Sequence, residues 1–180
     1  RVVEPLGELS NAGHIIPGDH GGFQYDINSP ALNVYAVADG YLLRVERNRP
    51  FYDLKSKNYH LYFEYSCTMF GSYVHVTELA PELLEANEQL KALDQPADVP
   101  DNQRNIYARI PVKAGQLLGR VEEWGLLGML TVDTDVTLPG FINPERYDDE
   151  PWKIHAVSFQ DYFAEPLRSQ LLAKNPRQTD

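Results

Sequence analysis

The stretch from residue 59 to 77 constrains the fold most, because aromatic and β-branched residues dominate it over a length suited to two strands. This composition predicts a β-hairpin. Side chains alternate across a strand, so we expect Tyr73 and His75 on one face of the second strand and Val74 and Val76 on the other. The hairpin would therefore bring a histidine to a face that it shares with a tyrosine.

Further strands are indicated on both sides of this hairpin. The pair Asp39 and Gly40 separates two apolar runs over residues 33–46, which predicts a second β-hairpin or a sharp strand corner. A short strand is expected near residues 22–25, among turn-forming residues that favour loops. Downstream, apolar runs predict strands that close the sheet, at residues 106–112, 116–122 and 126–132.

An insertion separates the hairpin from these later strands. Leucines at helical spacing predict one helix over residues 80–93, and a polar, proline-bearing connector follows over residues 94–105. We treat residues 78–105 together as this inserted helix and loop.

The C-terminal extension, residues 150–180, has its own pattern. It predicts a strand at residues 153–157 and then a short amphipathic helix over residues 159–174. Pro166 is expected to interrupt that helix, because proline lacks the backbone donor that a helix interior needs.

Length and composition complete the fold prediction. The chain has 180 residues, 43% of them hydrophobic, which suffices for one packed core without disulfide or metal staples. We therefore expect a single mainly β domain over residues 1–180, with an inserted helix and a C-terminal helix.

Charge, cysteine content and hydropathy limit the kinds of partner and environment that we expect. The chain carries 26 acidic and 16 basic side chains, a formal net charge of -10 that repels phosphate backbones, so nucleic acid is not an expected partner. The single cysteine, Cys67, rules out an internal disulfide and leaves the compartment open. No apolar run is long enough for a transmembrane helix, so no membrane span is expected.

Three short phrases occur in order at residues 34–40, 73–75 and 112–119. They resemble the core of the lysostaphin-type zinc endopeptidases, also called the LytM domain and built as a duplicated hybrid motif. The resemblance covers residues 5–133. It implies a LytM-like β-barrel or sandwich, and it suggests a cell-envelope or secreted location.

The same resemblance implies metal ligands, and the chain departs from the family there. In the family, a His-x-x-x-Asp segment precedes the first phrase and a His-x-His strand follows the third. His20 occupies the first histidine position, whereas Asp26 lies outside the usual spacing. Met129 and Thr131 replace both histidines of the strand, and neither substitutes well for imidazole on zinc. The chain thus resembles a degenerate member that lacks the His-x-His motif.

Other candidate site residues follow from the same alignment. His75 matches the family histidine that stabilises the hydrated carbonyl, which makes it the catalytic candidate. Tyr73 beside it, and Glu64 on the preceding strand, are candidate ligand-binding residues. Asp133 takes the place of an acidic residue after the His-x-His motif and would supply an oxygen ligand to a cation together with His20 and Asp26. The structural alternative is that these side chains pack a strand or cap a turn.

Two more sets of residues receive a structural interpretation. His60 and His155 are isolated on apolar strands and are predicted to be packed or surface residues. The many tyrosines and Trp124 would either line a sugar-binding groove or fill a core.

Three functions follow as hypotheses. The first is a peptidase-like β domain without standard zinc endopeptidase activity, which binds a glycan, a peptide or a protein partner and needs no cofactor. The second is a metal-dependent hydrolase or lyase with a rebuilt site around His20 and His75, using zinc or another divalent cation to activate water. The third is an assembly module that uses its helices as an interface. The first is favoured, because loss of a ligand abolishes tight zinc binding whereas the scaffold needs only core residues.

Overall fold

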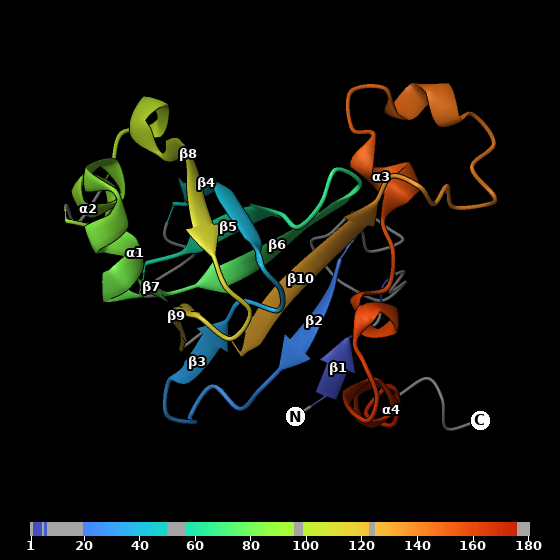
Figure 1. Cartoon of the computed structure of the whole chain (residues 1–180), viewed down its shortest axis with the longest axis horizontal. Helices are drawn as coiled ribbons and strands as arrows, with labels where there is room; N and C mark the ends of the chain where they lie inside the picture. Colours follow the sequence, from blue (N-terminus) through green and yellow to red (C-terminus); the bar gives the residue numbers. More distant parts are fainter. Residues whose placement is uncertain are drawn as a thin grey trace.

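The computed structural model describes residues 2–4, 6, 20–49, 57–95, 99–122 and 125–175. Within these residues, ten strands form two antiparallel sheets (Figure 1). The strands are β1 (Val2–Glu4), β2 (Gly21–Gln24), β3 (Leu32–Tyr35), β4 (Gly40–Arg47), β5 (Tyr59–Glu64), β6 (Met69–Val76), β7 (Glu78–Leu79), β8 (Asn105–Val112), β9 (Leu117–Val121) and β10 (Leu126–Asp133). The mainly β prediction is confirmed.

The larger sheet has seven strands in the order β1-β2-β10-β6-β5-β4-β8, and the smaller has three in the order β3-β9-β7. β1 and β8 end the larger sheet and are not paired with each other, so the described strands do not close into a barrel. The prediction that the strands after the insertion close the sheet is wrong, because β8 and β9 belong to different sheets.

The segment around Asp39 and Gly40 is a strand corner and not a hairpin. β3 pairs with β9 in the smaller sheet, whereas β4 pairs with β5 and β8 in the larger one. A Cβ on Gly40 would lie 2.4 Å from the carbonyl oxygen of Glu64, so only glycine fits this close approach. The Asp39 carboxylate accepts bonds from Lys113 Nζ and Ala114 N, at 2.7 and 2.9 Å, and joins the corner to the β8–β9 connection.

One hydrophobic core joins the two sheets. It contains buried side chains from the larger sheet, among them Leu42, Leu61 and Tyr73, and from the smaller sheet, among them Val34 and Leu118. One face of the larger sheet therefore packs on the core, which leaves its other face available for a site.

β5 and β6 form the predicted hairpin, but the alternation along β6 is broken. The register pairs Tyr59 with Val76 and Leu61 with Tyr73, so one strand has an extra residue. His75 lies in this bulge with φ at 71°, in the left-handed region. Tyr73 and Val76 consequently both enter the core, which corrects the prediction that they occupy opposite faces.

The insertion contains two helices where one was predicted. They are α1 (Pro81–Ala86) and α2 (Glu88–Asp94), followed by the 3₁₀ helix η1 (Asp101–Gln103). Asn87 adopts an extended conformation between them, and its side chain accepts bonds from the backbone N–H groups of Gln89 and Leu90. An asparagine that caps the second helix thus ends the first. Leu83, Leu90 and Leu93 still reach the core.

The C-terminal segment lies on the opposite side of the molecule from α1 and α2, beside β1 and β10 (Figure 1). Its elements are η2 (Pro144–Tyr147), α3 (Trp152–His155), η3 (Phe159–Tyr162) and α4 (Leu167–Leu172). The strand predicted at residues 153–157 is wrong, because α3 occupies most of it and only Ala156 bridges to Val132. The predicted interruption at Pro166 is confirmed, since α4 begins just after it. No described helix is long and apolar enough to cross a bilayer.

Candidate functional site

β5 carries the centre of the site because its side chains alternate strictly between two environments. Tyr59, Leu61 and Phe63 are almost fully buried in the core, whereas His60 and Tyr62 point to the opposite face. We call this the outer face of the larger sheet.

A hydrogen-bonded cluster connects β5 to β4 on the outer face. The register sets Arg44 opposite Tyr62 and Glu46 opposite His60. The Tyr62 hydroxyl lies 3.1 Å from Glu46 Oε2 and 2.8 Å from His60 Nδ1. The Arg44 guanidinium lies 3.6 Å from the centre of the Tyr62 ring, and its Nη2 is 3.7 Å from Glu46 Oε2. These contacts hold the His60 and Tyr62 rings in fixed positions.

β6 and β10 extend the outer face. Ser72 pairs with Tyr62 on one side and with Leu130 on the other, and it is 3% exposed. Among the described residues, neither Ser72 Oγ nor His60 Nε2 has a hydrogen-bond partner, although both atoms are buried. Buried polar atoms without partners are rare in folded proteins and call for an explanation.

His20 reaches the same face from the start of β2. A Cβ on Gly128 would lie 3.6 Å from His20 Nε2 and 3.3 Å from the Cβ of Val74. The absence of a side chain on Gly128 therefore leaves room for the imidazole beside β10.

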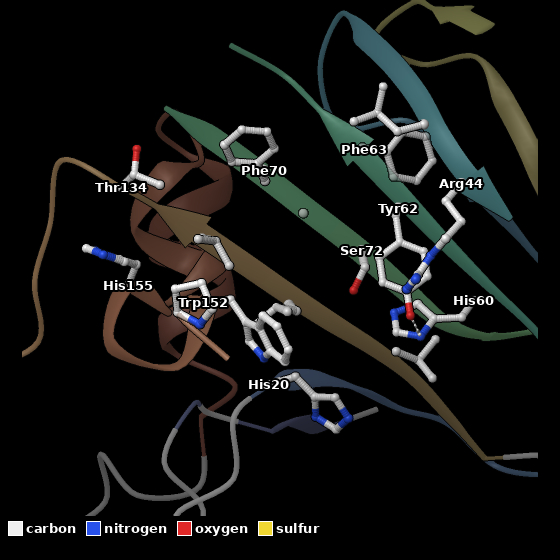
Figure 2. A pocket seen from close by; sticks show the side chains of 16 residues that line it. His20, Arg44, His60, Tyr62, Phe63, Phe70, Ser72, Thr134, Trp152 and His155 are labelled. Atoms are coloured by element: carbon white, nitrogen blue, oxygen red, sulfur yellow. Dashed lines mark hydrogen bonds between the residues drawn. The ribbon is translucent and has the colours of Figure 1, made fainter. Parts of the chain in front are cut away.

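A pocket of about 660 Å³ is lined by outer-face residues that include His20, Arg44, His60, Tyr62 and Ser72. Figure 2 shows Arg44, His60 and Tyr62 at one end, Trp152 and His155 at the other, and Ser72 between them. Trp152 and His155 come from α3, and the His155 ring is held by a 2.6 Å contact between Nδ1 and the carbonyl oxygen of Val136. Apolar residues complete the lining, among them Leu43, Phe70, Val74, Leu130 and Val132. An apolar cavity with a few polar groups is the usual form of a small-molecule site.

The cluster is uncharged at His60 and Tyr62 near neutral pH. Burial lowers the pKa of His60 to about 3, and the nearby charges of Arg44, His20 and His75 act in the same direction. Burial raises the pKa of Tyr62 to about 12, and the neighbouring Glu46 carboxylate adds to this against the opposing effect of Arg44. The site thus offers a neutral imidazole and a neutral phenol.

The two candidate residues on β6, His75 and Tyr73, occupy different environments in the structure. His75 lies in the bulge, close enough to His60 to affect its pKa. Tyr73 is 2% exposed in the core, where its hydroxyl donates to the carbonyl oxygen of Tyr35 at 3.2 Å. Tyr73 is therefore no part of the outer-face pocket.

The acidic candidates occupy three separate places. Glu64 pairs with Phe70 across the hairpin, and both its oxygens accept bonds from Arg109, at 3.0 and 3.2 Å. Asp26 caps an exposed turn through the N–H groups of Asn28. Asp133, at the end of β10, accepts bonds from Asp135 N and from the Tyr162 hydroxyl. The structure does not bring these carboxylates to His20.

The zinc implied by the resemblance does not fit the described residues. Met129 pairs with Gly21, so Met129 and Thr131 face away from the Gly128 side on which His20 lies. Met129 is itself buried in the core. No three histidine, cysteine, aspartate or glutamate side chains in the described part of the chain are placed to share a metal ion. Asp19, which precedes His20, lies outside the described residues, as does Trp124.

Sequence reasoning missed most of the pocket. His60 was interpreted as a packed or surface residue, and Arg44, Tyr62, Ser72 and Trp152 were not singled out. One available signal was the polar residue at every second position of β5, between positions that are fully apolar or aromatic. The contribution of Trp152 had no comparable signal, because it depends on α3 folding back onto the sheet.

No family model matches this chain, and no curated protein matches it either. Assignment of the site therefore depends on its geometry.

Proposed function

We propose that the chain is a peptidase-like β domain that binds a saccharide in the outer-face pocket and does not act as a zinc endopeptidase. The observation that carries this proposal is the pocket itself, where aromatic residues surround buried polar atoms that have no partner in the described part of the chain.

The scaffold part of the proposal is supported by how the resembling phrases lie. The first phrase covers the end of β3, the corner and the first residue of β4, and the third runs from the end of β8 into β9. Asp39 of the first phrase bonds to Lys113 and Ala114 of the third. Two phrases distant in sequence thus form one structural unit, as a duplicated motif would require.

The position of the pocket favours a saccharide over an extended peptide. β5, β6 and β10 are interior strands whose backbone groups are paired within the sheet. A peptide main chain is usually bound through free backbone groups at a sheet edge, which this face lacks. Recognition here must come from side chains, and saccharide hydroxyls are suited to such contacts.

The aromatic wall supports the same ligand class. Trp152 is 38% exposed and borders the pocket in Figure 2. An indole offers a flat apolar surface with one polar tip, which complements the apolar face of a sugar ring.

Saccharide binding is testable on the whole chain. Saturation-transfer NMR with methyl glycosides of glucose, mannose and N-acetylglucosamine, and with their short oligomers, should detect binding. Trp152→Ala should weaken it by about tenfold or more, since a buried aromatic anchor typically contributes that much. Tyr35→Ala is the matched control, because Tyr35 is 49% exposed on β3 of the smaller sheet and does not line the pocket. An absence of binding across the panel, or equal binding by Trp152→Ala, contradicts the proposal.

Calorimetry with zinc tests the non-peptidase part separately. We expect no stoichiometric binding at submicromolar concentration and neutral pH. Tight binding would support the alternative, a metal-dependent hydrolase or lyase around His20 and His75, for which the described residues provide no third ligand.

A further inference from the structure

Two polar atoms of the outer-face pocket have no hydrogen-bond partner among the described residues, and they differ in whether they donate or accept. His60 Nε2 and Ser72 Oγ are both buried, and both residues line the pocket. A serine hydroxyl donates one hydrogen bond and also accepts, whereas a neutral imidazole nitrogen donates or accepts according to its tautomer. The tautomer of His60 therefore decides what the pocket recognises.

The neighbours of His60 set that tautomer. A carboxylate only accepts hydrogen bonds, so the Tyr62 hydroxyl uses its one proton on Glu46 Oε2. The Tyr62 oxygen is then the acceptor in its 2.8 Å contact with His60 Nδ1, which must carry the proton. In a neutral ring, Nε2 is then left with a free lone pair.

We infer that Glu46, Tyr62 and His60 form a relay that fixes His60 Nε2 as an acceptor, and that this atom and the Ser72 hydroxyl together bind one hydroxyl group of the saccharide. The inference rests on the proposed function and deepens it, because it names the group that is recognised. The bound hydroxyl donates its proton to His60 Nε2, and its oxygen accepts the proton of Ser72 Oγ.

This two-point contact distinguishes closely related ligands. A deoxy sugar loses both hydrogen bonds at that position. An O-methyl ether keeps an acceptor but cannot donate to His60, and its added methyl group requires space between β5 and β6. A hydroxyl that satisfies both buried atoms should be preferred over either analogue, since leaving them unpaired is costly.

The geometry of the relay is tested first, without any ligand. Two-dimensional ¹⁵N–¹H NMR of the imidazole nitrogens of the full chain should show His60 protonated at Nδ1, with Nε2 at the shift of a bare nitrogen. Tyr62→Phe should move the proton to Nε2, because Nδ1 then loses its acceptor. Glu64→Gln is the matched control, because Glu64 is a carboxylate on the same face of β5 as His60 and Tyr62. It should leave the His60 tautomer unchanged. A wild-type His60 protonated at Nε2 overturns the relay.

The ligand half is tested with deoxy and mono-O-methyl analogues of the methyl glycoside that binds in the panel. At one hydroxyl position both replacements should weaken binding about tenfold or more. Ser72→Ala, which removes a hydroxyl with no partner in the described structure, should fold normally and lower the penalty of the deoxy analogue at that position only. Equal affinity of Ser72→Ala and wild type for every analogue overturns the inference while saccharide binding stands. If no saccharide binds, the proposed function fails together with this subsite, whereas the NMR result still decides the relay.

Discussion

The two faces of β5 and β6 use the same backbone for different purposes. On the inner face, Leu61, Phe63 and Tyr73 are at most 2% exposed and belong to the core that also contains side chains of the smaller sheet and the insertion. On the outer face, His60 is partly buried and Ser72 is buried, and each keeps a buried polar atom without a partner in the described structure. The inner face therefore provides stability, and the outer face retains capacity for a ligand. Neighbouring residues of one strand thus serve the two roles, because their side chains point to opposite faces of the sheet.

The largest expected difference between the faces is in stability. Leu61→Ala should lower the free energy of unfolding by about 2–5 kcal/mol, because it leaves a cavity in a core where this side chain is fully buried. Tyr62→Phe, at the next position but on the outer face, should cost only about 1 kcal/mol, the typical contribution of a hydrogen bond. Urea denaturation at neutral pH measures both.

The difference between the two losses in free energy of unfolding is more informative than either value. Equal losses for Leu61→Ala and Tyr62→Phe would mean that the outer face is part of the folding core. The pocket would then be a packing defect and not a site.

The inner face is the part of the molecule that the sequence predicts well. The alternating apolar residues of β5 and the apolar runs of β4, β8 and β10 are sufficient to place strands and core, because burial of apolar area follows a simple period. The pairing between strands is harder to predict from the sequence. The corner at Gly40 and the separation of β8 from β9 depend on which sheet receives each strand, and local sequence does not encode that choice.

The pH dependence of the free energy of unfolding tests the burial of His60 on the outer face. Its pKa of about 3 in the folded chain lies below the ordinary value of 6.5, so between these values the unfolded chain binds a proton that the folded chain does not. The free energy of unfolding therefore falls as the pH falls, by up to about 1.4 kcal/mol per pH unit. Between pH 6.5 and 4.5 the His60 contribution should reach about 2 kcal/mol.

His60→Gln isolates this contribution, because glutamine does not titrate. Urea denaturation of both chains at pH 6.5 and 4.5 should show the steeper loss in the wild type. Parallel losses would indicate that His60 is accessible to solvent in the folded chain, and the outer face would then lack the burial that defines the site.

His75 tests whether the bulge or the imidazole matters at the boundary of the two faces. Its φ of 71° suits asparagine and strongly disfavours β-branched residues. His75→Val should therefore cost about 1–2 kcal/mol more than His75→Asn in urea denaturation. If both substitutions are equally costly, the side chain of His75 carries a role that the backbone conformation does not explain.

The same bulge explains why the two faces of β6 were not predicted correctly from the sequence. A regular alternation would place Tyr73 and His75 on one face, and the family resemblance separately made His75 the catalytic candidate. The extra residue brings Tyr73 and Val76 together in the core, and Val74 lines the pocket. A single left-handed residue thus changes the composition of both faces, and no periodic pattern in the sequence reveals it.

The smallest expected effect is on zinc affinity, and it distinguishes the two faces of β10. Thr131→His restores the second imidazole of the family's His-x-His motif at a partly exposed position. Because Thr131 points away from the side on which His20 lies, the added ring cannot share an ion with His20, and calorimetry should show no gain in zinc affinity. Leu130→His places an imidazole on the same face as His20 and is the matched comparison. Stoichiometric submicromolar zinc binding by Thr131→His alone would mean that His20 and Thr131 share a face, and the assignment of inner and outer faces along β10 would have to be reversed.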